Sequence, residues 1–225
     1  MDTPDNNEKT PDSEVKDVLG DESGVNDEFM EGSQGSESFV KEARPEYNKK
    51  YTYTDYLTWD DDVRRELIDG VPYMMAGPNS QHQKISRNLF RQFDRFLEDK
   101  PCEIYYAPFD VRLNADTLDD TVVQPDLIVV CDESKIEDAG CVGAPDLVVE
   151  ILSPSTSNYD KTTKYDAYQK AGIREFWVID PVKKTLAVHL LEDGIYITRV
   201  YTKDDTVGVH VLEGCKINLA EVFKE

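Results

Sequence analysis

Two apolar runs decide how this chain folds: residues 122–130, Val-Val-Gln-Pro-Asp-Leu-Ile-Val-Val, and residues 147–152, Leu-Val-Val-Glu-Ile-Leu. Both runs are short and rich in β-branched residues, so we predict two strands, the second buried on both faces of a sheet. Each run carries one carboxylate, Asp126 in the first and Glu150 in the second. Because an ionised carboxylate is costly to bury without a cation nearby, these two acids mark a candidate site.

The pattern around these runs predicts an α/β domain with a mixed central β-sheet flanked by helices. Asp69-Gly70 between apolar segments is typical of a β-hairpin. We expect strands over residues 66–68, 71–75, 103–107, 109–113, 122–130, 147–152, 174–179, 185–191, 195–201 and 207–211. We expect helices over residues 55–59, 81–99 and 219–223, and another that begins after a cap at Ser157 or Asn158 and ends at Gly172. Residues 132–142 are expected to form a polar loop.

The first 45 residues differ sharply in composition from the rest. They hold 13 acidic and 4 basic side chains, a net charge of −9 out of the −21 of the whole chain. Such a segment buries too little apolar surface to offset the entropy of ordering it. We therefore expect a disordered acidic tail over residues 1–45 and one folded domain over residues 46–225. One hypothesis is that the tail mimics DNA and restrains the domain.

Composition also bounds the cellular setting and the partners. No apolar run reaches 18 residues, and the first residues lack the pattern of a signal peptide, so we expect a cytoplasmic protein without a membrane partner. The cysteines lack metal-site spacing, and we expect reduced thiols at Cys102, Cys131, Cys141 and Cys215. The negative net charge argues against non-specific binding to nucleic acid. A homodimer stays open.

Asp126 and Glu150 could ligate one divalent ion if their strands are neighbours and the two positions are level, because adjacent strands lie only about 4.8 Å apart. Asp146 cannot share that ion with Glu150, since four residues of strand span roughly 13 Å. The alternative for Asp126 is an acid at the start of a strand that accepts hydrogen bonds from backbone amides.

Lys164 shares a helix face with Ala167 and Ala171, and small residues of this kind indicate the face that packs on a sheet. A semi-buried ammonium group needs an anion, and Glu150 or a phosphate would serve. The alternative is a surface pair between Lys164 and Asp160, one helical turn earlier.

The helix predicted over residues 81–99 has two different faces. His82 lies on the apolar side in the first turn and is expected to point toward the sheet, either as a core residue or as a group that positions water or metal. The opposite side carries a basic stripe, Lys84, Arg87, Arg91 and Arg95. This stripe is either a solvated face or a contact for DNA phosphates. Glu66, in the hairpin, is either an ordinary hairpin carboxylate or part of the site.

The two runs and the helix that follows them resemble the Uma-type restriction endonuclease family of the PD-(D/E)XK nuclease superfamily. The resemblance covers about residues 50–200. It rests on Val-Val-Gln-Pro-Asp-Leu-Ile-Val-Val, on Ala-Pro-Asp-Leu-Val-Val-Glu-Ile-Leu-Ser-Pro-Ser-Thr, and on Asp160-x-x-x-Lys164-x-x-x-Tyr168 with the segment up to Pro181. It implies a restriction-endonuclease-like core and a metal-dependent endonuclease that hydrolyses DNA phosphodiester bonds.

The resemblance also implies roles for single residues. Asp126 and Glu150 would hold Mg²⁺ or Mn²⁺. Lys164 would serve as a lysine displaced from the usual superfamily position, which is Leu152 here. Glu66 and His82 match positions near that site. From the residues themselves, the runner-up is a catalytically silent module on the same fold that binds nucleic acid or a partner protein.

Overall fold

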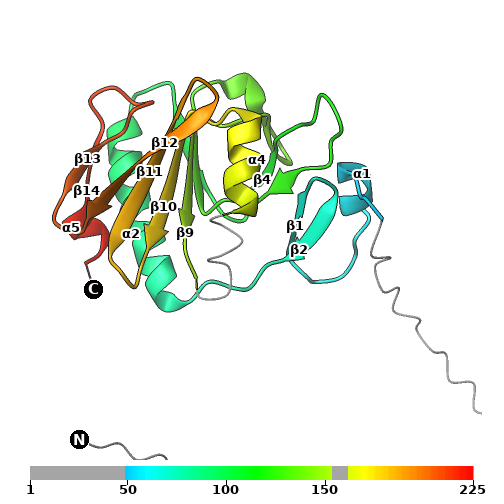
Figure 1. The fold of residues 1–225 in the computed structure, drawn as a ribbon, viewed down its shortest axis with the longest axis horizontal. Coiled ribbons are helices and arrows are strands. Elements are labelled where there is room, and N and C mark those ends of the chain that lie inside the picture. The colour runs from blue at the N-terminus through cyan, green and yellow to red at the C-terminus, as the bar shows by residue number, and fades with distance from the viewer. Residues whose placement is uncertain (1–48, 154–161, 225) are drawn as a thin grey trace, which may run out of the picture. The chain divides into compact units, whose positions relative to one another are not determined.

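The structure is a computed structural model that describes residues 49–153 and 162–224, all of which belong to one compact unit, Pro45–Glu225. Within these residues the strands form two six-stranded sheets and one two-stranded sheet (Figure 1). The tail expected over residues 1–45 and the helix caps expected at Ser157 or Asn158 lie outside the described residues.

The central sheet is the one that carries both apolar runs. Its strands are, in order across the sheet, β12 (Ile195–Thr202), β11 (Thr185–Glu192), β10 (Glu175–Asp180), β9 (Leu147–Ile151), β6 (Leu127–Val130) and β3 (Glu103–Tyr106). Strands β9 and β10 run parallel, whereas the other neighbouring pairs are antiparallel. The prediction of an α/β domain with a mixed central sheet is confirmed.

Helices cover the central sheet on both faces (Figure 1). On one face, α2 (Ser80–Leu97) packs its apolar stripe against the sheet, together with α5 (Leu219–Val222). On the other face, α4 (Thr163–Ala171) and the second sheet close the core. Side chains alternate along a strand, so Val149 and Ile151 of β9 face α2, and Glu150 faces the side of α4.

The second sheet holds the predicted hairpin. Its strands are, in order, β2 (Val71–Met74), β1 (Arg65–Ile68), β5 (Val122–Val123), β4 (Asp110–Arg112), β8 (Gly140–Val142) and β7 (Ile136–Glu137). Strands β1 and β2 pair with Ile68 opposite Val71, and the two turn residues Asp69 and Gly70 have φ of 46° and 73°. Positive φ at both positions is the backbone of a tight two-residue hairpin turn, as Asp-Gly predicts.

One strand prediction fails at a proline. Residues 122–130 were expected to form one strand, but β5 and β6 belong to different sheets, and the chain passes between the sheets at residues 124–126. Pro125 lies in this joint and cannot donate a ladder hydrogen bond. Pro108, which follows a cis peptide bond, lies between β3 and β4, the two strands predicted on either side of it, and these strands also belong to different sheets. The consequence for function is that Asp126 lies where the two sheets meet.

Other expectations also need correction. The first helix is α1 (Tyr53–Tyr56), which is capped by Thr52 and begins two residues before the predicted range of 55–59. The loop expected over residues 132–142 contains a short 3-10 helix (Glu133–Lys135) and the β7–β8 hairpin. The chain end adds β14 (Lys216–Asn218), which pairs with β13 (Thr206–Gly208).

The cysteines depart in part from the expected reduced state. Cys102 and Cys131 form a disulfide, because they flank the paired strands β3 and β6 and lie 3.9 Å apart at Cα. Cys141 and Cys215 are free and buried, and burial raises the pKa of each thiol to about 11. Among the described residues, no helix has the length and apolar character needed to cross a membrane.

Burial of His189 predicts a pH dependence of stability. The ring is 9% exposed, stacks on Phe176, and lies with Nδ1 2.7 Å from Thr198 Oγ1. Burial lowers the pKa of His189 from its usual 6.5 to about 4. The unfolded chain therefore binds a proton that the folded chain does not, and this contribution to stability is complete above pH 6.5 and lost as the pH falls toward 4.

At about 1.4 kcal/mol per pKa unit, the loss attributable to His189 is on the order of 3 kcal/mol across that window. Urea unfolding measured between pH 4 and pH 7 checks this expectation. The matched variant is His189→Gln, which retains a polar side chain but has no group that titrates in this range. If His189→Gln shows the same slope of stability against pH as the wild type, His189 is not the source.

Candidate active site

Asp126 and Glu150 meet across the β6–β9 pair. These strands are antiparallel neighbours, with Leu127 opposite Val149 and Ile128 opposite Val148. One further step in this register sets Asp126 opposite Glu150. Directly opposed residues of an antiparallel pair have Cβ atoms roughly 4.5–5.5 Å apart. The two acids therefore satisfy both conditions for sharing an ion, neighbouring strands and level positions.

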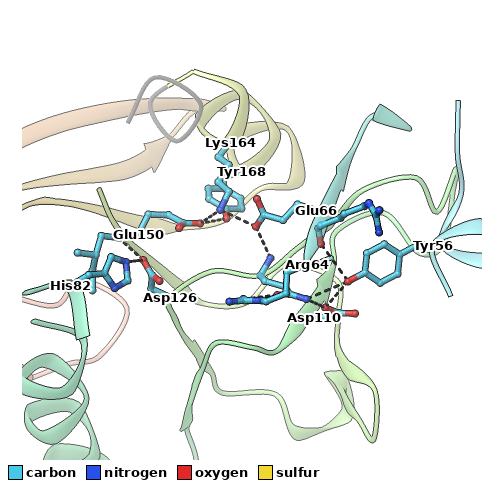
Figure 2. A network of polar contacts seen from close by, with 12 residues as sticks. Tyr56, Arg64, Glu66, His82, Asp110, Asp126, Glu150, Lys164 and Tyr168 are labelled. Carbon is cyan, nitrogen blue, oxygen red and sulfur yellow. Dashed lines mark hydrogen bonds and ion pairs between the residues drawn. The ribbon is translucent and has the colours of Figure 1, made fainter. Parts of the chain in front are cut away.

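Asp126 uses one carboxylate oxygen for structure. Its Oδ2 accepts a hydrogen bond from the backbone amide of Ile151 at 2.7 Å and lies 3.1 Å from His82 Nε2 (Figure 2). Its Oδ1 has no hydrogen bond within residues 49–153 and 162–224. The side chain is 19% exposed and lines a cleft. The alternative of a structural acid at a strand start thus describes Oδ2, while Oδ1 is available to a ligand.

Asp146 occupies the equivalent position at the other end of the same strand pair. It precedes β9 and accepts a hydrogen bond from the backbone amide of Cys131 at 2.7 Å, just as Asp126 precedes β6 and accepts one from Ile151. The Asp146 carboxylate also pairs with Arg174, and Asp146 does not line the cleft. Asp146 thus binds a backbone amide as Asp126 does but does not line the cleft. A comparison of the two acids can therefore separate the structural role of Asp126 from a role in the cleft.

Lys164 is buried at the centre of an ionic cluster. It is 2% exposed, and its Nζ lies 2.8 Å from Glu66 Oε1 and 2.9 Å from Glu150 Oε1. Tyr168, one turn later on α4, donates a hydrogen bond from its hydroxyl to Glu150 Oε1 at 2.6 Å (Figure 2). Lys164 is thus fully buried rather than semi-buried as expected. Asp160, the partner of the alternative surface pair, lies outside the described residues.

Glu66 brings the second sheet into the site. It lies on β1, is 0% exposed, and its Oε1 also accepts a hydrogen bond from the backbone amide of Gln124 at 2.7 Å. This burial and the pairing with Lys164 distinguish Glu66 from an ordinary hairpin carboxylate. The central sheet supplies Glu150, the joint between the sheets supplies Asp126, and α4 supplies Lys164.

These groups line a cleft of about 240 Å³. Its charged lining consists of Glu66, Asp126 and Glu150 against the cations Arg64 and Lys164, with His82 beside them. The excess of hard carboxylate oxygens suits Mg²⁺ or Mn²⁺. In the described part of the chain no group of three or more His, Cys, Asp or Glu could hold a metal ion. The two carboxylates that could ligate an ion in this cleft are those of Asp126 and Glu150, which the β6–β9 register sets level.

The basic stripe of α2 does not reach the cleft. Its four members, Lys84, Arg87, Arg91 and Arg95, are all exposed, and none of them lines the cleft. The residues of α2 that do line it are His82, Gln83 and Ser86. Contact between the stripe and DNA stays a prediction.

Three residues of the site were missed from the sequence: Tyr168, Gln124 and Arg64. Tyr168 stands one helical turn after Lys164 in the motif Asp160-x-x-x-Lys164-x-x-x-Tyr168, but the sequence does not reveal a partner for its hydroxyl. Gln124 directly precedes Pro125-Asp126, and Arg64 lies two residues before Glu66 and so shares its face in an extended chain. These spacings were the available signals.

Comparison with known proteins identifies the family of this chain. Residues 53–220 match the model of the Uma2 family, whose description is "Putative restriction endonuclease". The chain belongs to the Uma2 family. It is 29% identical over 160 residues to the uncharacterized protein slr1290 of Synechocystis sp., covering 69% of this chain and 83% of the relative. It is 28% identical over 137 residues to the uncharacterized protein sll1609 of the same organism, covering 59% and 76%.

A solved structure is also similar to this chain. It is named "a putative nuclease belonging to DUF820" from Anabaena variabilis, and the match has a TM-score of 0.62 and 21% identity over 76% of this chain and 97% of the other. At this identity the match shows the fold, which confirms the restriction-endonuclease-like core. Family and fold together point to a nuclease.

Proposed function

We propose that this Uma2 protein is a metal-dependent endonuclease that hydrolyses DNA phosphodiester bonds in the cleft where its two six-stranded sheets meet. One observation carries the proposal. Asp126 immediately precedes β6, and the β6–β9 register, extended by one residue, sets it level with Glu150 on β9. Asp126 keeps one carboxylate oxygen for a ligand, while the other is anchored by Ile151 and His82. Two opposed carboxylates beside a buried lysine form an arrangement suited to phosphoryl chemistry.

Asp126 and Glu150 would hold Mg²⁺ or Mn²⁺, which when bound lowers the pKa of a coordinated water and offsets charge on the phosphate. The residues of the chain prepare this cleft. His82 fixes the orientation of Asp126, and Tyr168 and Lys164 fix that of Glu150. Lys164 also lines the cleft, so its ammonium group lies near the place where negative charge would develop on the attacked phosphate.

The proposal gives DNA phosphates outside the cleft a second contact, the basic stripe of α2 (Lys84, Arg87, Arg91 and Arg95). This stripe extends along the exposed side of the same helix that places His82 in the cleft. Charge contacts of this kind would position the DNA without reading its sequence.

The test is cleavage of supercoiled plasmid by the full chain. We expect nicked or linear product with Mg²⁺ or Mn²⁺, none in EDTA, and a rate at least about 100-fold lower for Asp126→Ala and for Glu150→Ala, since each removes an electrostatic group of the site. Equal cleavage by the wild type and both variants would contradict the proposal. DNA binding without cleavage in either metal would instead support a catalytically silent module on the same fold.

A further inference from the structure

Arg64 is a cation in the cleft that takes no part in holding the metal or orienting its ligands. It immediately precedes β1 and lies two residues before Glu66, so both side chains point to the same face. Arg64 lines the cleft together with Asp126, Glu150 and Lys164. Figure 2 shows its guanidinium group extended toward the joint between the sheets.

The guanidinium group is held by a neutral amide instead of a carboxylate. Its Nε and Nη2 both donate to Gln124 Oε1, at 3.2 and 2.7 Å. Within residues 49–153 and 162–224, no carboxylate oxygen lies within 4.0 Å of an Arg64 nitrogen, although acids line the same cleft. Arg64 therefore keeps its charge uncompensated by a direct ion pair and has further N–H donors to offer.

Gln124 fixes the position of Arg64 relative to the candidate metal ligands. The side-chain amide of Gln124 cannot flip, because its Nε2 donates to Asp110 Oδ1 at 2.8 Å and to the Tyr56 hydroxyl at 3.2 Å (Figure 2). This orientation directs Oε1 toward Arg64. The backbone amide of Gln124 also binds Glu66, and the chain continues directly through Pro125 to Asp126. The Arg64 side chain therefore has little conformational freedom left to lose when an anion binds.

We propose that Arg64 is a phosphate-binding residue that contacts a non-bridging oxygen of the DNA strand in the cleft. The planar guanidinium fork matches phosphate geometry, and a fork that is held in place loses less entropy per hydrogen bond formed. The proposal rests on the proposed function, because it requires DNA in this cleft. It adds a substrate contact from the residue just before β1 of the second sheet, in the cleft that Asp126 and Glu150 also line.

The experiment measures binding of a fluorescently labelled DNA duplex by anisotropy, with the full chain in EDTA so that nothing is cleaved, over a range of salt concentrations. We expect Arg64→Gln to weaken binding by about 10- to 100-fold, the range for a charge-assisted hydrogen bond. We also expect the slope of log K against log salt to fall by about 1, as for one lost phosphate contact. Arg64→Lys should retain most of that slope.

Arg65→Gln is the matched control, because it removes the same charge one residue away. Arg65 pairs with Asp61 and lies over the Trp59 ring, away from the cleft lining. Its variant should leave the salt slope unchanged. Weaker binding by Arg64→Gln with an unchanged slope, or an equal fall in slope for both variants, would overturn the assignment of Arg64 while plasmid cleavage still supports the nuclease. If the wild type neither binds duplex nor cleaves plasmid, both proposals fail.

Discussion

Replacing Lys164 with Met is expected to lower the free energy of unfolding by about 3–5 kcal/mol, the cost of removing one partner from a buried ion cluster. The cluster has two carboxylates, Glu66 at 0% and Glu150 at 4% exposure, and Lys164 lies within 2.9 Å of both. Without the ammonium group, two like charges would share a site that water scarcely reaches. Equilibrium urea unfolding at pH 7 measures the effect.

Lys170→Met is the matched control on the same helix. Lys170 also lies 2.9 Å from a carboxylate oxygen, that of Asp69, but both side chains are more than half exposed. Exposed pairs contribute about 0–1 kcal/mol, so this variant should be nearly neutral. Adding Glu66→Gln to Lys164→Met should recover part of the lost stability by removing one of the two charges. If Lys164→Met and Lys170→Met lower the free energy of unfolding equally, burial of the ion cluster is not the cause of the loss.

The elements that the sequence predicted well are those whose signal is local. The Asp69-Gly70 turn, the run of residues 147–152, and the helix with apolar residues every three or four positions each carry their pattern within one segment. The candidate acids followed from the same logic. Asp126 and Glu150 stand out because each interrupts an apolar run, and the observed strand register then brings them level.

The second sheet escaped prediction because its pairings join distant segments. Strand β5 has only two residues and pairs with β1, where Val122 lies opposite Leu67, and β4 pairs in parallel with β8. Nothing local distinguishes such a short strand from the longer run that follows it. The same reason hid Arg64 and Gln124, whose contacts span 60 residues of sequence. The disulfide between Cys102 and Cys131 likewise depends on the pairing of β3 with β6.

Replacing Asp126 with Asn is expected to reduce Mg²⁺-dependent cleavage by at least about 100-fold while leaving the fold intact. The two side chains have the same shape, and the amide oxygen of Asn can still accept the hydrogen bond from the Ile151 backbone amide. The NH₂ group then replaces Oδ1, the oxygen available in the cleft, and cannot ligate a cation. Single-turnover cleavage over a Mg²⁺ titration, with thermal unfolding in parallel, measures both effects.

Asp146→Asn is the control for the structural share of that change. Asp146 accepts a backbone amide across the same strand pair at the same 2.7 Å, but it lies at the opposite end and outside the cleft. Its pair with Arg174 contributes little, because the Arg174 side chain is 60% exposed. We expect the two variants to unfold at similar temperatures and only Asp126→Asn to lose cleavage. If both cleave like the wild type, the Asp126 carboxylate serves the backbone alone, and the metal must be held by other groups.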